Sequence, residues 1–113
     1  MKKYLVLYQS SVKAADQMAS ANPEQAQAGM DLWTSWMGKA GHAIVEIGQP
    51  SNPLTTIRPD GSSTAPTAPY VGGYGILQAE SLADLEKVLV DHPHFHAADA
   101  SIAVLELIDL PGM

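Results

Sequence analysis

Four short segments of the chain are almost wholly apolar, and each is bounded by polar residues or by glycine or proline. They lie at 4–8 (YLVLY), 43–47 (AIVEI), 70–79 (YVGGYGILQA) and 102–108 (IAVLELI). Short continuous runs of aliphatic and aromatic residues are typical of buried β-strands. We therefore predict four strands at these positions.

Two further segments repeat apolar residues at helical spacing. The first follows Asn22, a good capping residue, has Pro23 at its first position and ends before Gly41. The second follows Ser81 and stops at Pro93. The apolar residues of the first helix form one stripe, and those of the second share one face: Ala26, Gly29, Met30, Trp33, Trp36, Met37 and Ala40, and then Leu82, Leu85, Val88 and Leu89. Residues 10–21, which are polar and alanine-rich, give no clear pattern.

The resulting order, β-α-β-β-α-β, predicts a single α+β domain over residues 1–113 with a ferredoxin-like, four-stranded antiparallel sheet. Two helices can cover only one face of such a sheet. The strands are apolar on both faces, however, except at Glu46 and Glu106, for which an edge-strand position in solvent is the simpler explanation. We therefore expect a homodimer in which a second copy covers the other face.

Residues 49–69 contain five of the eight prolines, and the segment Pro59-Asp60-Gly61-Ser62 predicts a tight turn inside a small hairpin. A connection this long is uncommon in a compact domain and is often a binding loop. Arg58 is its only cation and could meet an anionic ligand or form an exposed salt bridge.

Charge and composition exclude several classes of partner and chemistry. The net charge is −6 with only six lysines and arginines, which argues against nucleic acid and against anionic membrane surfaces. Cysteine is absent, so thiol chemistry and disulfides are excluded. No apolar run is long enough to span a membrane, and YLVLY is too short for the core of a signal peptide, so we expect a cytoplasmic protein.

Several pieces of sequence, in this order, resemble the YCII-related (DGPF-domain) family. They are the start MKKYLVLY, the pair Trp33-x-x-Trp36, and then IGQP, GGYGIL, ES and HP. The resemblance implies a dimeric α+β barrel, and members look like enzymes with a His/Asp pair. Here the DGPF motif is replaced by Thr67-Ala68-Pro69-Tyr70, and the first helix has no histidine. The family's catalytic pair therefore cannot be transferred to this chain.

His92, His94 and His96 form the spacing H-x-H-x-H. In an extended segment the three side chains would point the same way and could converge on a metal ion. Metal sites usually draw ligands from more than one element, so we favour a histidine at a helix end followed by a polar loop. We expect neither a metal nor an organic cofactor.

The candidate site residues are His42, Trp36, Arg58 and Tyr70. His42 could be a general base or a surface residue at the strand edge. Trp33, at the centre of the helical stripe, is expected in the core. Trp36, at the edge of the stripe, could either form one wall of a pocket or pack in the core, and core packing is the commoner case. Gly72, Gly73 and Gly75 lie inside a strand and indicate a bulge or a close backbone approach, not a dinucleotide motif.

We therefore expect a small-molecule pocket between the sheet, the first helix and the 49–69 loop, bordered by these four residues, in a cofactor-free enzyme. The sequence leaves two alternatives open. One is a non-catalytic binding or regulatory module. The other is a cofactor-free monooxygenase or decarboxylase like those on related dimeric barrels.

Overall fold

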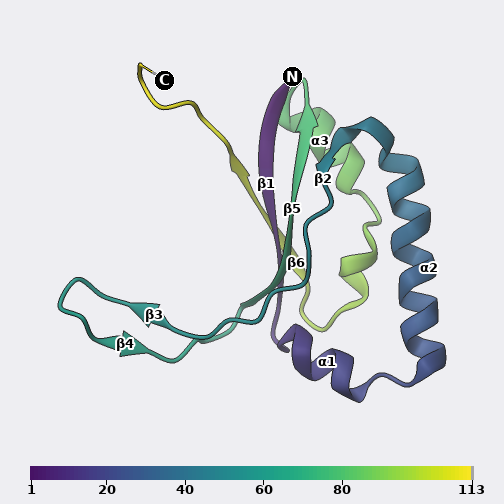
Figure 1. Cartoon of the computed structure of the whole chain (residues 1–113). Helices are drawn as coiled ribbons and strands as arrows, with labels where there is room; N and C mark the ends of the chain where they lie inside the picture. The colour runs from purple at the N-terminus through teal and green to yellow at the C-terminus, as the bar shows by residue number, and fades with distance from the viewer. Residues whose placement is uncertain (113) are drawn as a thin grey trace.

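The computed structural model describes residues 1–112 and has a mixed α+β architecture. One four-stranded antiparallel sheet carries helices on a single face (Figure 1). Its strand order is β2-β5-β1-β6, which is compatible with the predicted ferredoxin-like fold. The elements of this layer are β1 (Lys2–Ser10), α1 (Ala14–Ser20), α2 (Pro23–Ala40), β2 (Ile44–Glu46), β5 (Tyr70–Ala79), α3 (Leu82–Leu89) and β6 (Ser101–Glu106), with 3-10 turns η1 (Gly41–Ala43) and η2 (Pro93–His96).

Both predicted helices are confirmed, and side chains fix where each begins. Asn22 accepts a hydrogen bond from the backbone N–H of Gln25, whose side chain accepts from the Asn22 N–H in return. The Ser81 hydroxyl accepts from the Asp84 N–H at the start of α3. The chain also forms α1, which the sequence did not predict because it is short and buries no side chain. Within residues 1–112, no helix combines the length and apolar character needed to cross a bilayer.

The strands occupy the predicted places, with changes at their ends. The strand predicted at 70–79 is confirmed, and the first extends beyond 4–8 to cover Lys2–Ser10. The strand predicted at 43–47 shortens to Ile44–Glu46, because residues 41–43 form a 3-10 turn. The last strand ends at Glu106, not at residue 108. As expected, Glu46 and Glu106 are exposed and lie on the two edge strands.

The two faces of the sheet have different surroundings. Tyr4, Val6 and Tyr8 of β1 are buried beneath the helices. The alternate residues point to the opposite face, as the cross-strand pairs of β1 with β5 and β6 show. Within residues 1–112, no helix or strand covers this face (Figure 1). We call this the open face. Its central residues are apolar: Leu5, Leu7, Tyr74, Ile76, Ala103 and Leu105.

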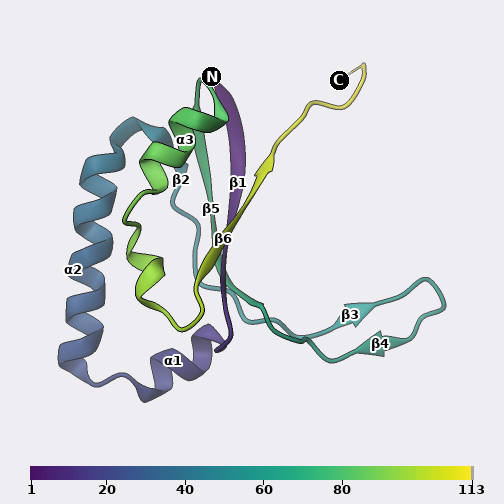
Figure 2. The same ribbon diagram turned by 180° about the vertical axis from the view of Figure 1, so that it is seen from behind.

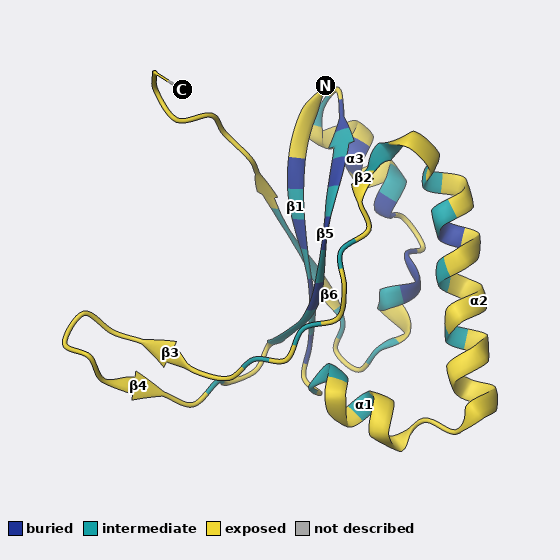
Figure 3. Ribbon diagram, viewed as in Figure 1, coloured by how far each residue is buried: buried dark blue, intermediate teal, exposed yellow. Residues whose placement is uncertain are grey.

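Residues 52–69 form an arm that leaves the sheet on the side away from the helices (Figures 1 and 2). The predicted hairpin is present in it, with β3 (Thr56–Ile57) paired to β4 (Ser63–Thr64) around a turn at Gly61. Every residue from 54 to 65 is exposed (Figure 3). The radius of gyration is 15.7 Å. A compact domain of this length has about 13 Å, so the arm lies outside the packed body.

Candidate functional site

A cavity of about 360 Å³ lies between the sheet and the first half of α2. It is present because α2 packs closely only over its second half. Trp36 is 5% exposed, whereas Met30 is 61% exposed and Ala26, at the start of the predicted stripe, is also exposed. Helix α1, the segment 47–50 and η2 form the other walls, and the cavity is open to solvent on part of its surface.

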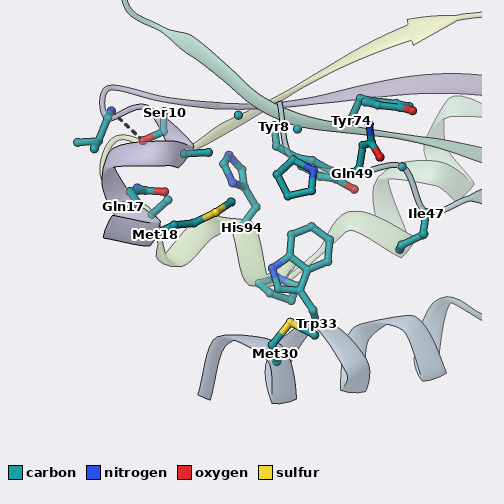
Figure 4. Close-up of a pocket in the computed structure, with 18 residues that line it drawn as sticks. Tyr8, Ser10, Gln17, Met18, Met30, Trp33, Ile47, Gln49, Tyr74 and His94 are labelled. Atoms are coloured by element: carbon teal, nitrogen blue, oxygen red, sulfur yellow. Dashed lines mark hydrogen bonds between the residues drawn. The ribbon is translucent and has the colours of Figure 1, made fainter. Parts of the chain in front are cut away.

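The walls of the cavity are mostly apolar and carry few polar groups (Figure 4). Met18, Met30 and Trp33 lie around it on the side of the helices, and Ile47 lies on the side of the segment that follows β2. The polar side chains on its lining are Tyr8, Ser10, Gln17, Gln49 and His94. Among the residues that the structure describes, no carboxylate, lysine or arginine lines it. An apolar cavity with a few placed polar groups is the usual form of a small-ligand site.

Among the described residues, His94 is the only histidine on this lining, and its ring is held by two main-chain carbonyl groups. Its Nε2 lies 2.8 Å from the oxygen of Gln9 and 3.1 Å from that of Ser101. Carbonyl oxygens only accept hydrogen bonds, so Nε2 must carry the proton. In the neutral ring, Nδ1 is then an acceptor. A neutral His94 can therefore take a proton at Nδ1.

His92 lies two residues before His94, and the residue is 1% exposed. Its Nδ1 accepts a hydrogen bond from the backbone N–H of His94 at 3.0 Å. Its ring packs against those of Tyr8, Trp33 and Trp36, with centroids 5.0, 4.7 and 4.3 Å away. Burial in this cluster, followed by the proximity of His94, lowers the pKa of His92 to about 4. His92 is therefore neutral at neutral pH and carries its proton on Nε2, for which no hydrogen-bond acceptor is found among residues 1–112.

Tyr8 contributes a hydrogen-bond donor to the cavity. Burial raises the pKa of its phenol to about 12, so the hydroxyl keeps its proton. Glycines on β5 make room for the ring: a Cβ at Gly73 would lie 3.5 Å from it, and one at Gly75 would lie 3.4 Å from its hydroxyl oxygen. The segment 46–50 also passes close to both glycines. The predicted close backbone approach at Gly73 and Gly75 is thus confirmed.

The two tryptophans differ in burial: Trp36 has the core position that was one of its two expected places, and Trp33 packs against the core but also borders the cavity. Trp36 donates from Nε1 to the Val88 carbonyl at 3.0 Å. Trp33, predicted in the core, is partly exposed and lines the cavity. The physical reason is the loose packing at the start of α2, because Trp33 lies one turn nearer to that end.

The four predicted site residues do not converge on one cavity. His42 is exposed in η1, and its main-chain oxygen accepts from Gln78 Nε2 at 2.7 Å. Arg58 and Tyr70 share a separate, open hollow of about 430 Å³ at the base of the arm. The Tyr70 ring also has the Lys13 ammonium 5.4 Å from its centroid. Roles for His42, Arg58 and Tyr70 in binding or catalysis stay predictions.

The three histidines of H-x-H-x-H point apart. Residues 93–96 form a 3-10 turn instead of an extended strand, so the alternation that would align the side chains is lost. His92 is buried, His94 lines the cavity and His96 is exposed. No group of three or more potential metal ligands occurs in the described part of the chain. His92 does follow the end of α3, as expected, but it is buried and packs against the rings of Tyr8, Trp33 and Trp36.

Sequence reasoning missed Tyr8 and His94 as cavity residues. The spacing of the three histidines drew attention to His94, but only as a metal ligand and not as a residue that lines a cavity. Tyr8 could have been noticed because a tyrosine in a buried strand faces glycines on the paired strand. Comparison of the sequence with protein-family models gave no match, and comparison with curated proteins gave none either.

Proposed function

We propose that this protein binds a small, uncharged and largely apolar molecule in the cavity beside His94, and that His94 accepts a proton from it. The observation that carries the proposal is the anchoring of His94 Nε2 on two carbonyl oxygens at the edge of an apolar cavity. Anchoring of this kind fixes the tautomer and the orientation of an imidazole, which a general base requires.

The chemistry of the lining supports an uncharged ligand. A charged ligand would lose its hydration without gaining an opposite charge, because the described lining contains no acidic or strongly basic side chain. The aromatic rings of Tyr8 and Trp33 favour a planar molecule. The cavity volume of about 360 Å³ lies near the lower end of the range for small-molecule sites.

A proton transfer would need only groups that the chain supplies. His94 Nδ1 would take a proton from an acidic O–H or C–H group of the ligand and become an imidazolium. The ligand would become the matching anion, and the Tyr8 hydroxyl could donate a hydrogen bond to its oxygen. Return of the proton to another ligand atom would complete an isomerisation and restore the neutral histidine.

Ligand binding is tested by thermal-shift measurements with neutral phenols, enols and aromatic ketones, because a ligand that binds only the folded state raises the unfolding temperature. Trp33→Ala should reduce the shift. His96→Gln serves as the control, since His96 is exposed in the same turn. If no probe raises the unfolding temperature, or if Trp33→Ala leaves every shift unchanged, the cavity is not the binding site.

The variant His94→Gln separates an enzyme from a binding module. Glutamine can still donate to the two carbonyl groups but cannot act as a base. An enzyme should lose turnover, measured as solvent-deuterium exchange into the bound ligand, while still binding it. Binding without any exchange in the unaltered protein would support the non-catalytic alternative.

We also propose that the chain is a homodimer, as the resemblance to YCII-related proteins implies. Support comes from the open face, whose central residues are apolar although helices cover only the other side. An exposed apolar sheet face of several hundred Å² is as large as the largest apolar patches on soluble monomers, and patches of that size often mark a protein–protein contact. Sedimentation at micromolar concentration should give twice 12.0 kDa, and a mass of 12.0 kDa would refute the dimer.

A further inference from the structure

We infer that the arm, residues 52–69, packs against a second copy of this chain and supplies part of the dimer interface. The inference rests on the proposed dimer and extends it to a specific segment. An exposed arm with a defined hairpin needs a surface to lie on, because an isolated two-stranded hairpin is at best marginally stable in water. Here each strand of the hairpin has only two residues.

The arm carries apolar side chains that make little contact with their own body. Leu54 is 77% exposed and Ile57 is 73% exposed. The interactions that order the hairpin are local and polar, such as the backbone bond from the Arg58 N–H to the Ser62 carbonyl at 2.8 Å. Covering Leu54 and Ile57 would remove apolar surface from water and would therefore stabilise the hairpin.

The direction of the arm indicates that the surface it packs against belongs to a second copy of the chain. The arm leaves the sheet on the side of the open face, and so does the chain after β6 (Figures 1 and 2). That C-terminal segment also exposes apolar residues, with Ile108 at 78% and Leu110 at 64%. Whatever covers the open face therefore lies between these two projections. From Asn52 to Asp60 the arm can reach about 30 Å, whereas packed sheets lie about 10 Å apart, so the arm extends well past a facing sheet.

The open face of the sheet alone is too small for a stable dimer interface, so another part of the chain must contribute to that interface. Four strands spaced about 4.8 Å apart, and paired on average over roughly six residues, give a face of about 400 Å², or about 800 Å² for two copies. Stable interfaces bury roughly 1,200 Å² or more. Two arms, related by the two-fold axis, can provide the difference. The central residues of the open face are uncharged, so the charge of −6 on each copy does not directly oppose their contact.

The test measures dimer dissociation by sedimentation over a range of concentrations. The double variant Leu54→Ser/Ile57→Ser should weaken the dimer at least tenfold while leaving the circular dichroism spectrum unchanged. The matched control is Leu82→Ser/Val90→Ser, which makes the same kind of change at residues 50% and 63% exposed on and just after α3. This control should leave dissociation unchanged.

Cross-linking gives an independent result, because the chain has no cysteine and a single one can be labelled cleanly. A benzophenone attached at Ile57→Cys should join two chains, whereas one at Ala28→Cys on α2 should not. If the arm variants leave the dissociation constant of the dimer unchanged and the benzophenone at position 57 forms cross-links only within one chain, the arm contact is wrong but the dimer is not. A monomeric wild-type protein overturns both the arm contact and the dimer proposed above.

Discussion

Protonation of His92 would place a positive charge among three aromatic rings, in a position with 1% exposure. It would also remove the acceptor for the His94 N–H, because Nδ1 would then carry a proton. The folded state therefore disfavours the charged form, which explains the pKa of about 4. The nearby titratable groups are His94, whose charge would repel that of His92, and Tyr8, which is neutral.

This shift makes stability depend on pH. The pKa of His92 is lower in the folded than in the unfolded chain, so the unfolded chain binds a proton at this residue more readily. The free energy of unfolding is therefore highest above about pH 6.5 and decreases as the pH falls towards 4. The full difference corresponds to about 3 kcal/mol. In His92→Asn the amide oxygen can replace Nδ1 as acceptor but cannot titrate. Urea unfolding at pH 7 and pH 4.5 should therefore show a smaller loss in this variant than in the wild type. Equal losses of unfolding free energy in the variant and the wild type would show that His92 does not cause the pH dependence.

The tryptophans give a second residue-level prediction. Trp36→Ala should lower the free energy of unfolding by about 3 to 5 kcal/mol through lost burial and a new cavity. Trp33→Ala should cost clearly less, because the side chain is partly exposed and already borders empty space. Denaturant unfolding of both variants measures the difference. A larger loss at Trp33 would restore the original assignment of Trp33 to the core.

At the scale of elements, the segment after β2 runs so close to β5 that one position requires glycine. Gly48 has a φ of +74°, and a Cβ there would overlap the main-chain carbonyl of Tyr74. A left-handed conformation alone costs a residue with a side chain about 1 to 2 kcal/mol. Gly48→Ala should therefore destabilise the protein by more than about 2 kcal/mol.

Gly29→Ala is the matched control for this substitution. Gly29 lies inside α2, where an added Cβ meets nothing within 4 Å. Alanine should therefore stabilise the helix by up to about 1 kcal/mol. Thermal unfolding compares the two variants, and a neutral Gly48→Ala would show that the segment can move away from β5.

Elements with strong local signals could be predicted from the sequence. The residues Asn22, Pro23 and Gly41 mark both ends of α2, and the turn at Gly61 marks the hairpin. The stripe of apolar residues predicted which side of α2 faces the sheet, but not how closely each turn of the helix packs against it. That depends on the angle between helix and sheet, which no local pattern encodes. The residues that line the cavity, and the different burial of Trp33 and Trp36, could not be predicted for this reason.

The same limit applies to the candidate site. His94 meets Gln9 and Ser101, and the first of these lies 85 positions away in the sequence. Contacts between distant segments depend on the register of β1 against β6. Spacing along the chain could therefore single out the three histidines but could not predict that they point in three directions.

At the scale of the whole molecule, the proposed dimer should depend on the centre of the open face. Leu7 lies there, paired with Tyr74 on one side and with Ala103 on the other. Leu7→Lys would bury two ammonium groups near the two-fold axis, so the variant should sediment as a monomer of 12.0 kDa. Leu32→Lys on α2, at a residue 45% exposed, should leave the dimer intact. A dimeric Leu7→Lys variant would exclude the facing-sheet arrangement.

The different surroundings of the two tryptophans also give the molecule an intrinsic optical signal. The chain has only these two indole rings, one sealed in the core and one on the cavity wall. Emission from Trp36 should be blue-shifted and insensitive to small quenchers such as acrylamide. Emission from Trp33 should be quenched by acrylamide and should change when the cavity fills. Occupancy of the site could therefore be followed by fluorescence, without a label and before the natural ligand is known.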